Sequence, residues 1–420
     1  MKALRWFTRI GPAFVIAAVV LGPGSVTTMT KMGAKHGYDM LWLPVLAGVL
    51  MAGFVTLFMR FGIATDRSYL QHCADLWGRP FAALCGFSMF YIATAFQVGN
   101  NIGVATAIDS LLTRGPNAKP PVPAWVWPVV FNAAALAFLF AFRRIYGILE
   151  KMMTSLVAVM LVAFFLNLLF ARPDLGGVAR GLVPSIPKGL DWMVAAGLLA
   201  TTFSIVGAIF QTYLVRARGW GKDDFGKGVA DSVSGIGMLM LISMVVMITS
   251  AAVLHPRGIE VRSAADMAGQ LEAFFGTAAR VIFCVGFAAA AFSSFLVNAM
   301  IGGTLLADGL GLGDDVNALA PKLCSALSLL IGMGVAILVT YFRTIDFAQA
   351  LVAAQAGTLL AIPLAIVSAG LVLFFPRRSG VRPLKPGAIA FAVLGLGVLV
   401  AVAVRSYATT IPALIKMLGG

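Results

Sequence analysis

The sequence predicts an all-α polytopic membrane protein, and three observations lead to this fold class. The 420-residue chain is 60% hydrophobic and only 11% charged, and its mean hydropathy is +0.94. A soluble globular domain carries about 25% charged residues, so this chain has too few polar side chains to cover a water-facing surface. This excludes soluble enzymes, disordered proteins and fibrous proteins. The apolar runs are also continuous, whereas the strands of a transmembrane β-barrel alternate polar and apolar residues.

Eleven apolar runs are long enough to cross a bilayer core of about 30 Å, which takes about 20 residues of α-helix. They cover residues 10–32, 40–63, 81–110, 123–142, 148–170, 192–214, 230–254, 277–301, 321–342, 347–375 and 387–409. No loop between them is long enough for a second domain, so we expect residues 1–420 to form one membrane domain. The first run continues without a small-residue cleavage site, and we expect it to be retained as a span rather than removed as a signal peptide.

The basic residues predict the orientation of the chain. Lys and Arg number 31 against 17 Asp and Glu, a net charge of +14. We expect no nucleic-acid partner, because the basic residues lie in loops between apolar spans. The N-terminus and every second loop hold 18 of the 31, and cytoplasmic loops carry the excess of positive charge. The sequence therefore places the N-terminus in the cytoplasm and, with an odd number of spans, the C-terminus outside the plasma (inner) membrane.

The first span is interrupted near its midpoint by Leu21-Gly22-Pro23-Gly24-Ser25. A proline removes a backbone donor and the adjacent glycines relax the chain, so we expect the helix to break there. Unpaired backbone at membrane depth is tolerated only where it is buried in protein or lines a cavity. A simple kink is the structural alternative, but we interpret the break as a functional one whose amides and carbonyls contact a solute.

The sixth span contains a second interruption, five spans after the first. Residues 201–213 read TTFSIVGAIFQTY, a polar stretch with Gly207 and no proline. Paired interruptions in corresponding spans indicate an inverted-repeat transporter with its site at the membrane midplane. We therefore predict two five-span repeats, residues 10–170 and 192–375, followed by an eleventh span at 387–409.

Polar side chains on other spans could complete a central site. The third span carries Gln97, Asn100 and Asn101, the eighth has neighbouring hydroxyl and amide groups, and the tenth has Gln349 and Gln355. Each of these groups could instead join two helices by a hydrogen bond worth about 0.6 kcal/mol. The two glutamines on a helix that faces a broken span favour a binding role.

Several short motifs occur in a fixed order along residues 10–370. They are Gly11-Pro12, Pro23-Gly24, Arg60-Phe61-Gly62-Ile63-Ala64-Thr65, Gly78-Arg79-Pro80, Leu149-Glu150, Ala171-Arg172-Pro173-Asp174, Arg180-Gly181-Leu182-Val183-Pro184, Tyr213-Leu214, Gln349 and Gln355-Ala356. In this order and spacing they resemble the Nramp (natural resistance-associated macrophage protein) family of metal-ion transporters. The resemblance implies a LeuT-type fold, a five-plus-five inverted repeat with an eleventh helix, and transport of a divalent metal ion by alternating access.

The chain departs from the family pattern where the resemblance implies metal binding. Typical members read Asp-Pro-Gly-Asn at the first break, where this chain has Gly22 and Ser25 at the outer positions. The thioether, imidazole and amide positions of the sixth span fall on Ala208, Phe210 and Gln211. Loss of the thioether favours hard ions such as Mg²⁺ or Mn²⁺ over soft metals. With the carboxylate absent as well, the remaining neutral ligands suit a largely hydrated ion or a monovalent one rather than a dry divalent ion. The losses also put the family's proton pathway in question.

These arguments give the candidate site and two classes of substrate. The candidate substrate-binding residues are Gly22, Pro23, Gly24, Ser25, Gly207, Ala208, Gln211, Gln349 and Gln355, with Gln97, Asn100 and Asn101 as secondary candidates. A partly hydrated divalent ion of the Mg²⁺/Mn²⁺ type follows from the resemblance. An anionic or neutral organic solute, such as an amino acid or carboxylate, is the alternative, because the positive ends of half-helices favour a carboxylate. A sensor or scaffold that has lost transport is a third interpretation.

An enzyme is not predicted, because no nucleophile motif, phosphate loop or metal-ligand helix motif is present and the three histidines lie far apart in separate loops. The four cysteines have no CxxC spacing, so neither a disulfide framework nor a zinc site is indicated. We predict no cofactor and no cluster of metal-ligating side chains. The expected partners are the substrate and the lipid bilayer, and we expect a monomer.

Overall fold

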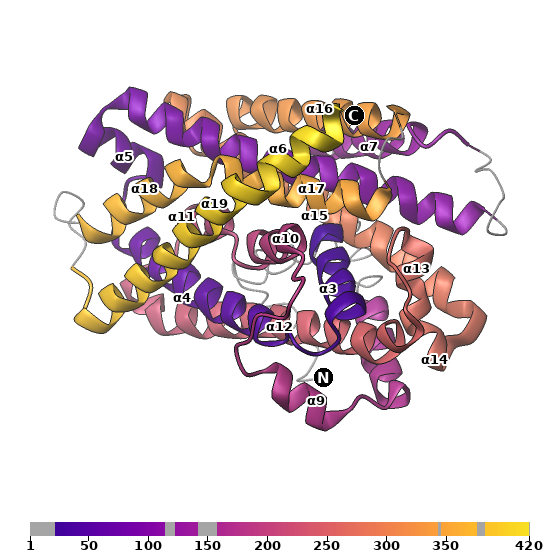
Figure 1. The fold of residues 1–420 in the computed structure, drawn as a ribbon. Coiled ribbons are helices and arrows are strands. Elements are labelled where there is room, and N and C mark those ends of the chain that lie inside the picture. Colours follow the sequence, from indigo (N-terminus) through magenta and orange to yellow (C-terminus); the bar gives the residue numbers. More distant parts are fainter. Residues whose placement is uncertain (1–21, 114–121, 142–157, 343–345, 376–382, 420) are drawn as a thin grey trace, which may run out of the picture.

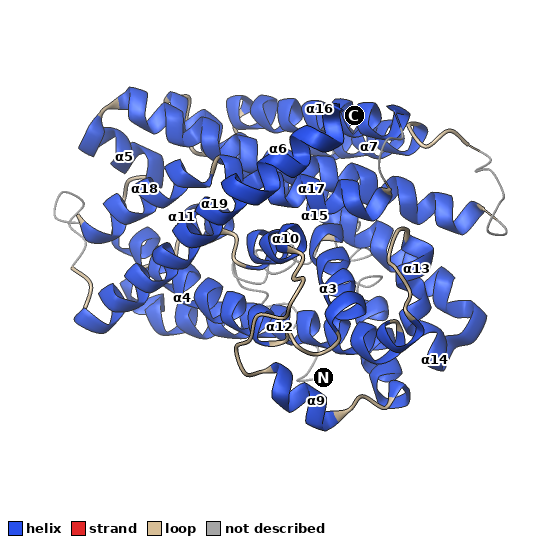
Figure 2. Cartoon of the chain, viewed as in Figure 1, coloured by secondary structure: helices blue, strands red, loops and turns tan. Residues whose placement is uncertain are grey.

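The computed structural model describes residues 22–113, 122–141, 158–342, 346–375 and 383–419. Helices form almost all of these segments, and no strand occurs within them (Figure 2). Seven helices are long and apolar enough to cross a membrane, and two further pairs of helices pass the same test as bent spans. The predicted all-α membrane fold class is therefore confirmed.

The continuous helices coincide with the predicted apolar runs. They are α4 (Trp42–Ala64), α6 (Arg79–Leu112), α7 (Val126–Ala141), α12 (Phe225–Val253), α15 (Ala279–Leu310), α16 (Leu319–Phe342) and α19 (Pro386–Gly419). The described part of the fifth run is the helix Ala158–Ala171. The length and hydropathy of each run were sufficient to place these elements to within a few residues, except that α15 and α19 continue about ten residues beyond the predicted ends.

The first span has a helix boundary at the predicted break. Helix α3 (Pro23–His36) begins at the proline, and Gly22 before it is extended, with φ −80° and ψ −179°. Pro23 suits the first helical position because its missing N–H would be unpaired there in any case. The non-helical residue is thus Gly22, whereas Pro23, Gly24 and Ser25 form the first turn of α3. The predicted half-helix 10–21 lies outside the described residues.

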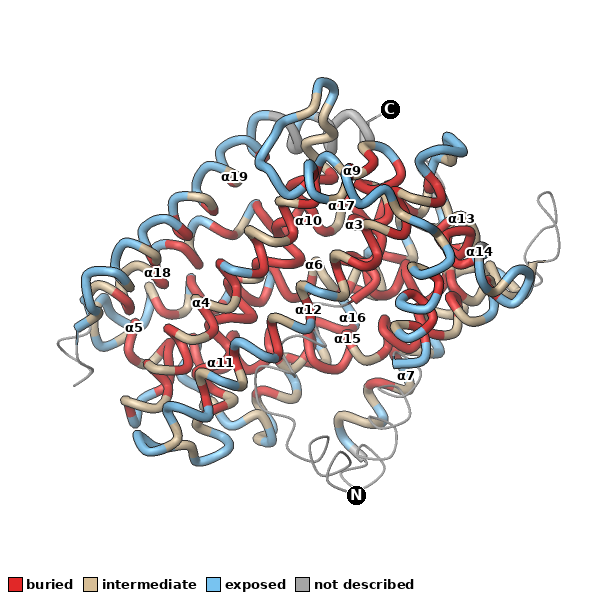
Figure 3. Tube along the Cα trace, turned by 90° about the horizontal axis from the view of Figure 1, so that it is seen from below, coloured by how far each residue is buried: buried red, intermediate tan, exposed pale blue. Residues whose placement is uncertain are grey.

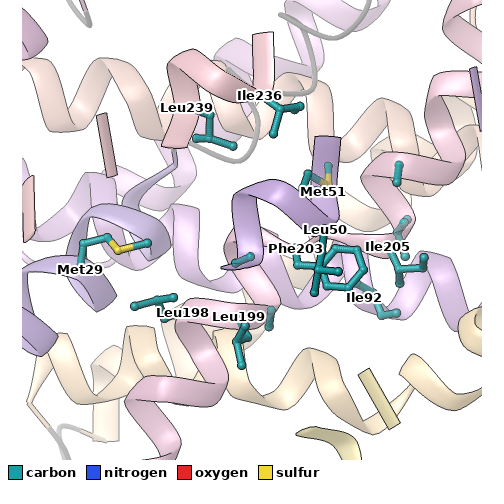
Figure 4. Packing of buried hydrophobic residues seen from close by; sticks show 14 of the residues in the cluster. Met29, Leu50, Met51, Ile92, Leu198, Leu199, Phe203, Ile205, Ile236 and Leu239 are labelled. Carbon is teal, nitrogen blue, oxygen red and sulfur yellow. The ribbon is translucent and has the colours of Figure 1, made fainter. Parts of the chain in front are cut away.

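The sixth span is broken as predicted, at Phe203-Ser204. Helix α10 (Trp192–Thr202) ends before these two residues and α11 (Ile205–Ala217) begins after them, where the Ser204 side chain accepts a hydrogen bond of 3.2 Å from the Gly207 amide. Phe203 is fully buried, and its ring meets that of Phe54 edge-on at a centroid distance of 5.1 Å. Figure 4 shows Phe203 among apolar side chains of α4 and α11, which fix the position of the break.

Other parts of the chain depart from straight spans in ways that the sequence analysis did not predict. The tenth span consists of α17 (Phe347–Gly357), a 3₁₀ turn η5 (Thr358–Leu360) and α18 (Ile362–Phe374), bent by 47°. Short helices occur in segments predicted as loops: α5 (Tyr69–Trp77), α9 (Leu175–Gly181), α13 (Ala264–Ala268) and α14 (Glu272–Phe275).

The broken sixth span lies at the centre of the molecule. Of the most apolar stretch of α10–α11, 89% is buried, compared with 28% for α16 and for α19. Figure 1 shows α10 and α3 side by side between the long helices. In Figure 3 the buried residues are concentrated around these two helices, and exposed residues run along α19. The apolar outer faces of α16 and α19 are those expected to meet lipid, because the bundle leaves them uncovered.

Candidate functional site

A small cavity lies where the discontinuous helices meet. Its volume is about 20 Å³ and its lining residues are Gly22, Gly24, Ser25, Phe96, Asn100, Thr201, Ser204, Ser294, Asn298 and Gln355. A cavity of about 10–15 Å³ on this measure holds one water molecule, so this space takes one water or one bare ion. We call it the central cavity.

Helix ends provide the backbone groups of the central cavity. Gly24 and Ser25 in the first turn of α3 line it, and the N–H groups of a first helical turn have no partner inside the helix. Gly22 supplies no side chain to cap them. Thr201 comes from the C-terminal turn of α10, where carbonyls carry partial negative charge, and Ser204 from the start of α11. The cavity therefore presents both donors and acceptors of backbone origin.

Gln355 of α17 supplies the most distinctive side chain of the central cavity. The residue is 1% exposed, and its Oε1 accepts no hydrogen bond from any described residue. A Cβ atom added at Gly24 would lie 2.2 Å from Gln355 Nε2, and one added at Gly99 would lie 2.7 Å from it. The amide therefore fits between α3 and α6 only because both helices have glycine there. A buried amide oxygen without a donor costs free energy unless an ion or water occupies the cavity.

The side-chain amides of α6 form a hydrogen-bonded chain from the central cavity to α7. Of the three secondary candidates, Gln97, Asn100 and Asn101, only Asn100 lines the cavity. Gln97 Nε2 donates to the Phe295 carbonyl at 2.6 Å, and Asn100 donates to Gln97 Oε1 at 3.1 Å. Asn101 donates to the Gln97 carbonyl and accepts from Asn132 at 2.6 Å. Asn100 thus reaches the cavity, while Gln97 and Asn101 hold α6 against its neighbours.

The structure brings some predicted site residues together and separates others. Gly22, Gly24, Ser25, Gln355 and the secondary candidate Asn100 line the central cavity. Pro23 packs against α6, since a Cβ atom at Gly103 would lie 2.7 Å from its ring. The predicted residues that are buried within α11 but do not line the cavity are Gly207, Ala208 and Gln211. Both amide atoms of Gln211 are without partners among the described residues.

Five lining residues were outside the predicted binding set, and four of them are polar. Ser294 and Asn298 face the cavity from α15, and Thr201 and Ser204 flank the break in the sixth span. All four are short polar residues at mid-depth of an otherwise apolar span, which is a signal visible in the sequence. The polar groups of these two spans were noted in the sequence analysis but were not assigned to the binding set. Phe96 also lines the cavity, but an aromatic residue in a membrane helix gives no such signal.

A larger cavity of about 530 Å³ lies about two helical turns from the central cavity along α3, α10 and α17, and we call it the vestibule. The predicted site residue Gln349 lines the vestibule, not the central cavity. Its charged and titratable lining residues are Lys31, Lys35, His36, Asp191, His255, Glu260 and Asp346. Thr28, Val352 and Gln355 meet at Gly197 of α10, where an added Cβ atom would be 3.2–3.7 Å from all three. This layer separates the vestibule from the central cavity.

The opposite end of the bundle is closed by buried hydrogen bonds. The Tyr213 hydroxyl of α11 donates to Asp308 Oδ2 of α15 at 2.6 Å and accepts from the Leu70 amide at 3.4 Å. Tyr69 of α5 donates to Ser368 of α18 at 2.9 Å. Tyr69, Tyr213 and Asp308 are at most 4% exposed. The three helices α5, α11 and α15 are therefore joined at this end, whereas the vestibule opens the other end.

No group of three or more His, Cys, Asp or Glu side chains within the described ranges is placed to hold a metal ion. Among the described residues, every side chain that lines the central cavity is neutral. An ion bound there would therefore be held by amide, hydroxyl and backbone oxygens.

Comparison with known proteins identifies related chains. The family model for natural resistance-associated macrophage protein-like sequences (Nramp) matches residues 13–411. A divalent metal cation transporter, MntH, of Yersinia pestis (strain Pestoides F) is 26% identical over 302 residues, which cover 70% of this chain and 71% of the relative. MntH of Deinococcus radiodurans is 25% identical over 380 residues, covering 88% and 82%.

Solved structures show the same fold. A crystal structure of a mutant manganese transporter from Eremococcus coleocola has a TM-score of 0.74 to this chain at 17% identity, and the match covers 99% of this chain and 94% of the other. A structure of the same transporter with a bound aromatic bis-isothiourea compound has a TM-score of 0.72 at 18% identity. At these identities the similarity establishes the fold and nothing finer.

The comparisons also bear on the sequence-based interpretations. The relatives are transporters, in line with a multi-pass membrane transporter and with the expectation that the chain is not an enzyme. The organic-solute alternative receives no support from them. The repeat boundaries, the orientation of the termini and the monomeric state stay predictions. The match over nearly the whole chain confirms the resemblance: the chain belongs to the Nramp family of metal-ion transporters.

Proposed function

We propose that the chain carries a hard divalent cation, such as Mg²⁺ or Mn²⁺, across the plasma membrane by alternating access. The unsatisfied Oε1 of Gln355 in the central cavity is the observation that supports this proposal most directly. An amide oxygen is a good ligand for a hard cation, and the neighbouring hydroxyls of Ser25, Thr201 and Ser294 are of the same class. The names of the MntH relatives support a divalent cation as the substrate.

The sizes of the two cavities support a sequence of events for the ion. The vestibule, at about 530 Å³, accommodates an ion with six waters, each of which takes about 30 Å³ in the liquid. The central cavity, at about 20 Å³, accommodates the ion or one water. A hydrated ion can therefore enter the central cavity in two ways. Either it loses most of its water at the Gly197 layer, or the side chains of that layer move apart to let it through. Because Mg²⁺ gives up water reluctantly, we propose that the layer opens, that the central cavity widens with it, and that the ion stays partly hydrated.

The same sizes argue against an amino acid or carboxylate in the central cavity. Such a solute has several non-hydrogen atoms, each of roughly the size of a water molecule, so the central cavity would have to widen more for it than for an ion that retains one or two waters. The neutral lining that made an organic solute plausible from the sequence is equally suited to an ion that retains water.

Uptake into proteoliposomes tests the proposal. We expect uptake of Mn²⁺ or Mg²⁺, and none of a panel of amino acids and small carboxylates. Gln355→Leu, which replaces the amide by a side chain of similar size, should lower divalent uptake about tenfold or more, because a hydrogen bond or ion contact to a buried acceptor is lost. Gln349→Leu, on the same helix but in the vestibule, is the matched control and should retain most of the activity. Uptake of no divalent ion, with no binding heat at millimolar concentration, would contradict the proposal.

A further inference from the structure

Lys31 places a positive charge in the vestibule, which the Gly197 layer separates from the central cavity. It lies six residues after Ser25 on α3 and is half-buried. Six residues of α-helix rise about 9 Å, so the backbone of Lys31 is about that far from the cavity-lining turn. No hydrogen bond or ion pair joins its ammonium group to another described residue, although its side chain lines the vestibule.

The carboxylates around Lys31 are already engaged with other groups. Asp191 pairs with Lys35 at 3.2 Å and caps α10 by accepting from the Val194 amide. Asp346 caps α17 by accepting from the Gln349 amide at 2.8 Å. Glu260 pairs with a neighbouring arginine, and this pairing lowers the pKa of the Glu260 carboxyl. The charge of Lys31 is therefore not neutralised by direct contact, although three carboxylates share the vestibule with it.

The vestibule leads toward the central cavity along α3, α10 and α17. Lys31 and Gln349 line the wide part, the Gly197 layer follows, and Ser25 and Gln355 line the central cavity. A cation that moves between the vestibule and the central cavity thus shares the vestibule with the Lys31 side chain. Repulsion between them acts on a divalent ion with twice the energy that it has for a monovalent ion.

We propose that Lys31 is a specificity-determining residue that lowers the apparent affinity of the transporter for divalent cations. This inference rests on the proposed function. At a separation equal to this backbone spacing of about 9 Å, a unit charge and a divalent ion in bulk water repel each other enough to change an equilibrium constant about fivefold, and the change is larger where less water separates them. The wild-type protein is then suited to an abundant cation present at high concentration, and release of the ion is favoured.

The test compares the concentration dependence of Mn²⁺ uptake in proteoliposomes for three variants. Lys31→Gln should lower the apparent KM about fivefold or more at low salt, whereas Lys31→Arg keeps the charge and should behave as wild type. Lys35→Gln removes the same unit of charge from the same helix, but one turn farther from the central cavity and from a side chain that is 56% exposed. It should produce a smaller shift, because solvent screens exposed charges.

Ionic strength separates electrostatics from a change in packing. Raising the salt from about 0.01 M to about 1 M shortens the screening length from about 30 Å to about 3 Å, so the difference between Lys31→Gln and wild type should shrink. An unchanged KM in Lys31→Gln, a shift of equal size in Lys35→Gln, or a shift independent of salt would overturn the inference while leaving the proposed function intact. A wild-type protein that takes up no divalent ion would overturn both.

Discussion

At the scale of single residues, the central cavity depends on glycines that allow side chains and backbone to come close together. Gln355 lies between Gly24 and Gly99, and neither position leaves room for a methyl group beside its amide. Gln355 and Gln349 were both predicted to face one site from the tenth span. They are six residues apart, which is about 9 Å along a helix and more than one and a half turns. Only Gln355 therefore reaches the central cavity. The presence of a polar residue in a span does not by itself show how deep in the membrane its side chain lies.

Gly24→Ala tests the close approach of Gln355 to α3. A Cβ atom there would lie 2.2–2.9 Å from the Gln355 side chain and would meet no backbone atom at that distance. We expect the helix to form but the amide to be displaced, so that divalent uptake falls about tenfold or more, as for loss of a buried acceptor. Gly237→Ala in α12, where nothing lies within 4 Å of an added Cβ, is the control and should transport normally. Uptake at the wild-type rate by Gly24→Ala would show that the Gln355 position is unimportant.

Gly22→Asp tests whether a carboxylate can be added to the central cavity. Gly22 is the N-cap of α3 and has an extended backbone, which is the conformation in which aspartate caps a helix, and its side chain would meet the cavity. We expect the apparent affinity for Mn²⁺ to rise about tenfold, because a charged oxygen ligand joins neutral ones. Gly22→Asn is the matched control, since asparagine also caps a helix but adds no charge. Equal affinities for the two variants would place the ion elsewhere.

At the scale of elements, apolar length and helix-breaking residues predicted most of the helices, and their failures have local causes. The break in the sixth span was predicted from polar residues and a glycine, without a proline, and it occurs at Phe203-Ser204. The bend in the tenth span was missed although Pro363 stands in the first turn of α18, where it cannot donate a helical hydrogen bond. Helix α5 was missed because it has nine residues, although Ser68 and Gln71 form a capping box that the sequence itself displays.

The packing of α6 against α15 gives a prediction for stability. A Cβ atom at Gly309 of α15 would lie 2.8 Å from the Ala82 carbonyl oxygen of α6, and this backbone atom cannot move aside on its own. We expect Gly309→Ala to lower the free energy of unfolding by about 1–3 kcal/mol, the cost of overpacking, measured by thermal or denaturant unfolding in detergent. Gly334→Ala in α16 has open space around the added methyl group and should be neutral or slightly stabilising. A stable Gly309→Ala protein would mean that the two helices separate at little cost.

At the scale of the whole molecule, the described residues are open at one end and closed at the other. The vestibule lies at the end where α3 finishes and α10 and α17 begin. The closed end is the one where α11 and α15 end, and Tyr213 and Asp308 are buried there. The sequence pattern predicts that the vestibule end faces outward, since loop charges place the N-terminus inside. It could not predict which end is closed, because that depends on contacts between α5, α11 and α15, which are far apart in the sequence.

Alternating access requires the closed end to open, and the bond between Tyr213 and Asp308 should resist this. Tyr213→Phe removes the 2.6 Å hydrogen bond to Asp308 Oδ2, which costs about 1–3 kcal/mol for a buried acceptor and should shift the population toward the form open at that end. Cys73 of α5 reports this change, because it is fully buried beside the closed layer and burial raises the pKa of its thiol, so it reacts slowly with thiol reagents.

In a background with the other three cysteines replaced, Tyr213→Phe should therefore increase the rate at which Cys73 is labelled about fivefold or more. Tyr38→Phe removes a hydroxyl that accepts from the Asp174 amide at the vestibule end, and it should leave the labelling of Cys73 unchanged because that contact is already at the open side. If Cys73 reacts equally fast in Tyr213→Phe and in the cysteine background alone, the hydroxyl does not hold the end closed. The apolar packing of Tyr69 and its neighbours would then have to keep the two sides of the membrane apart.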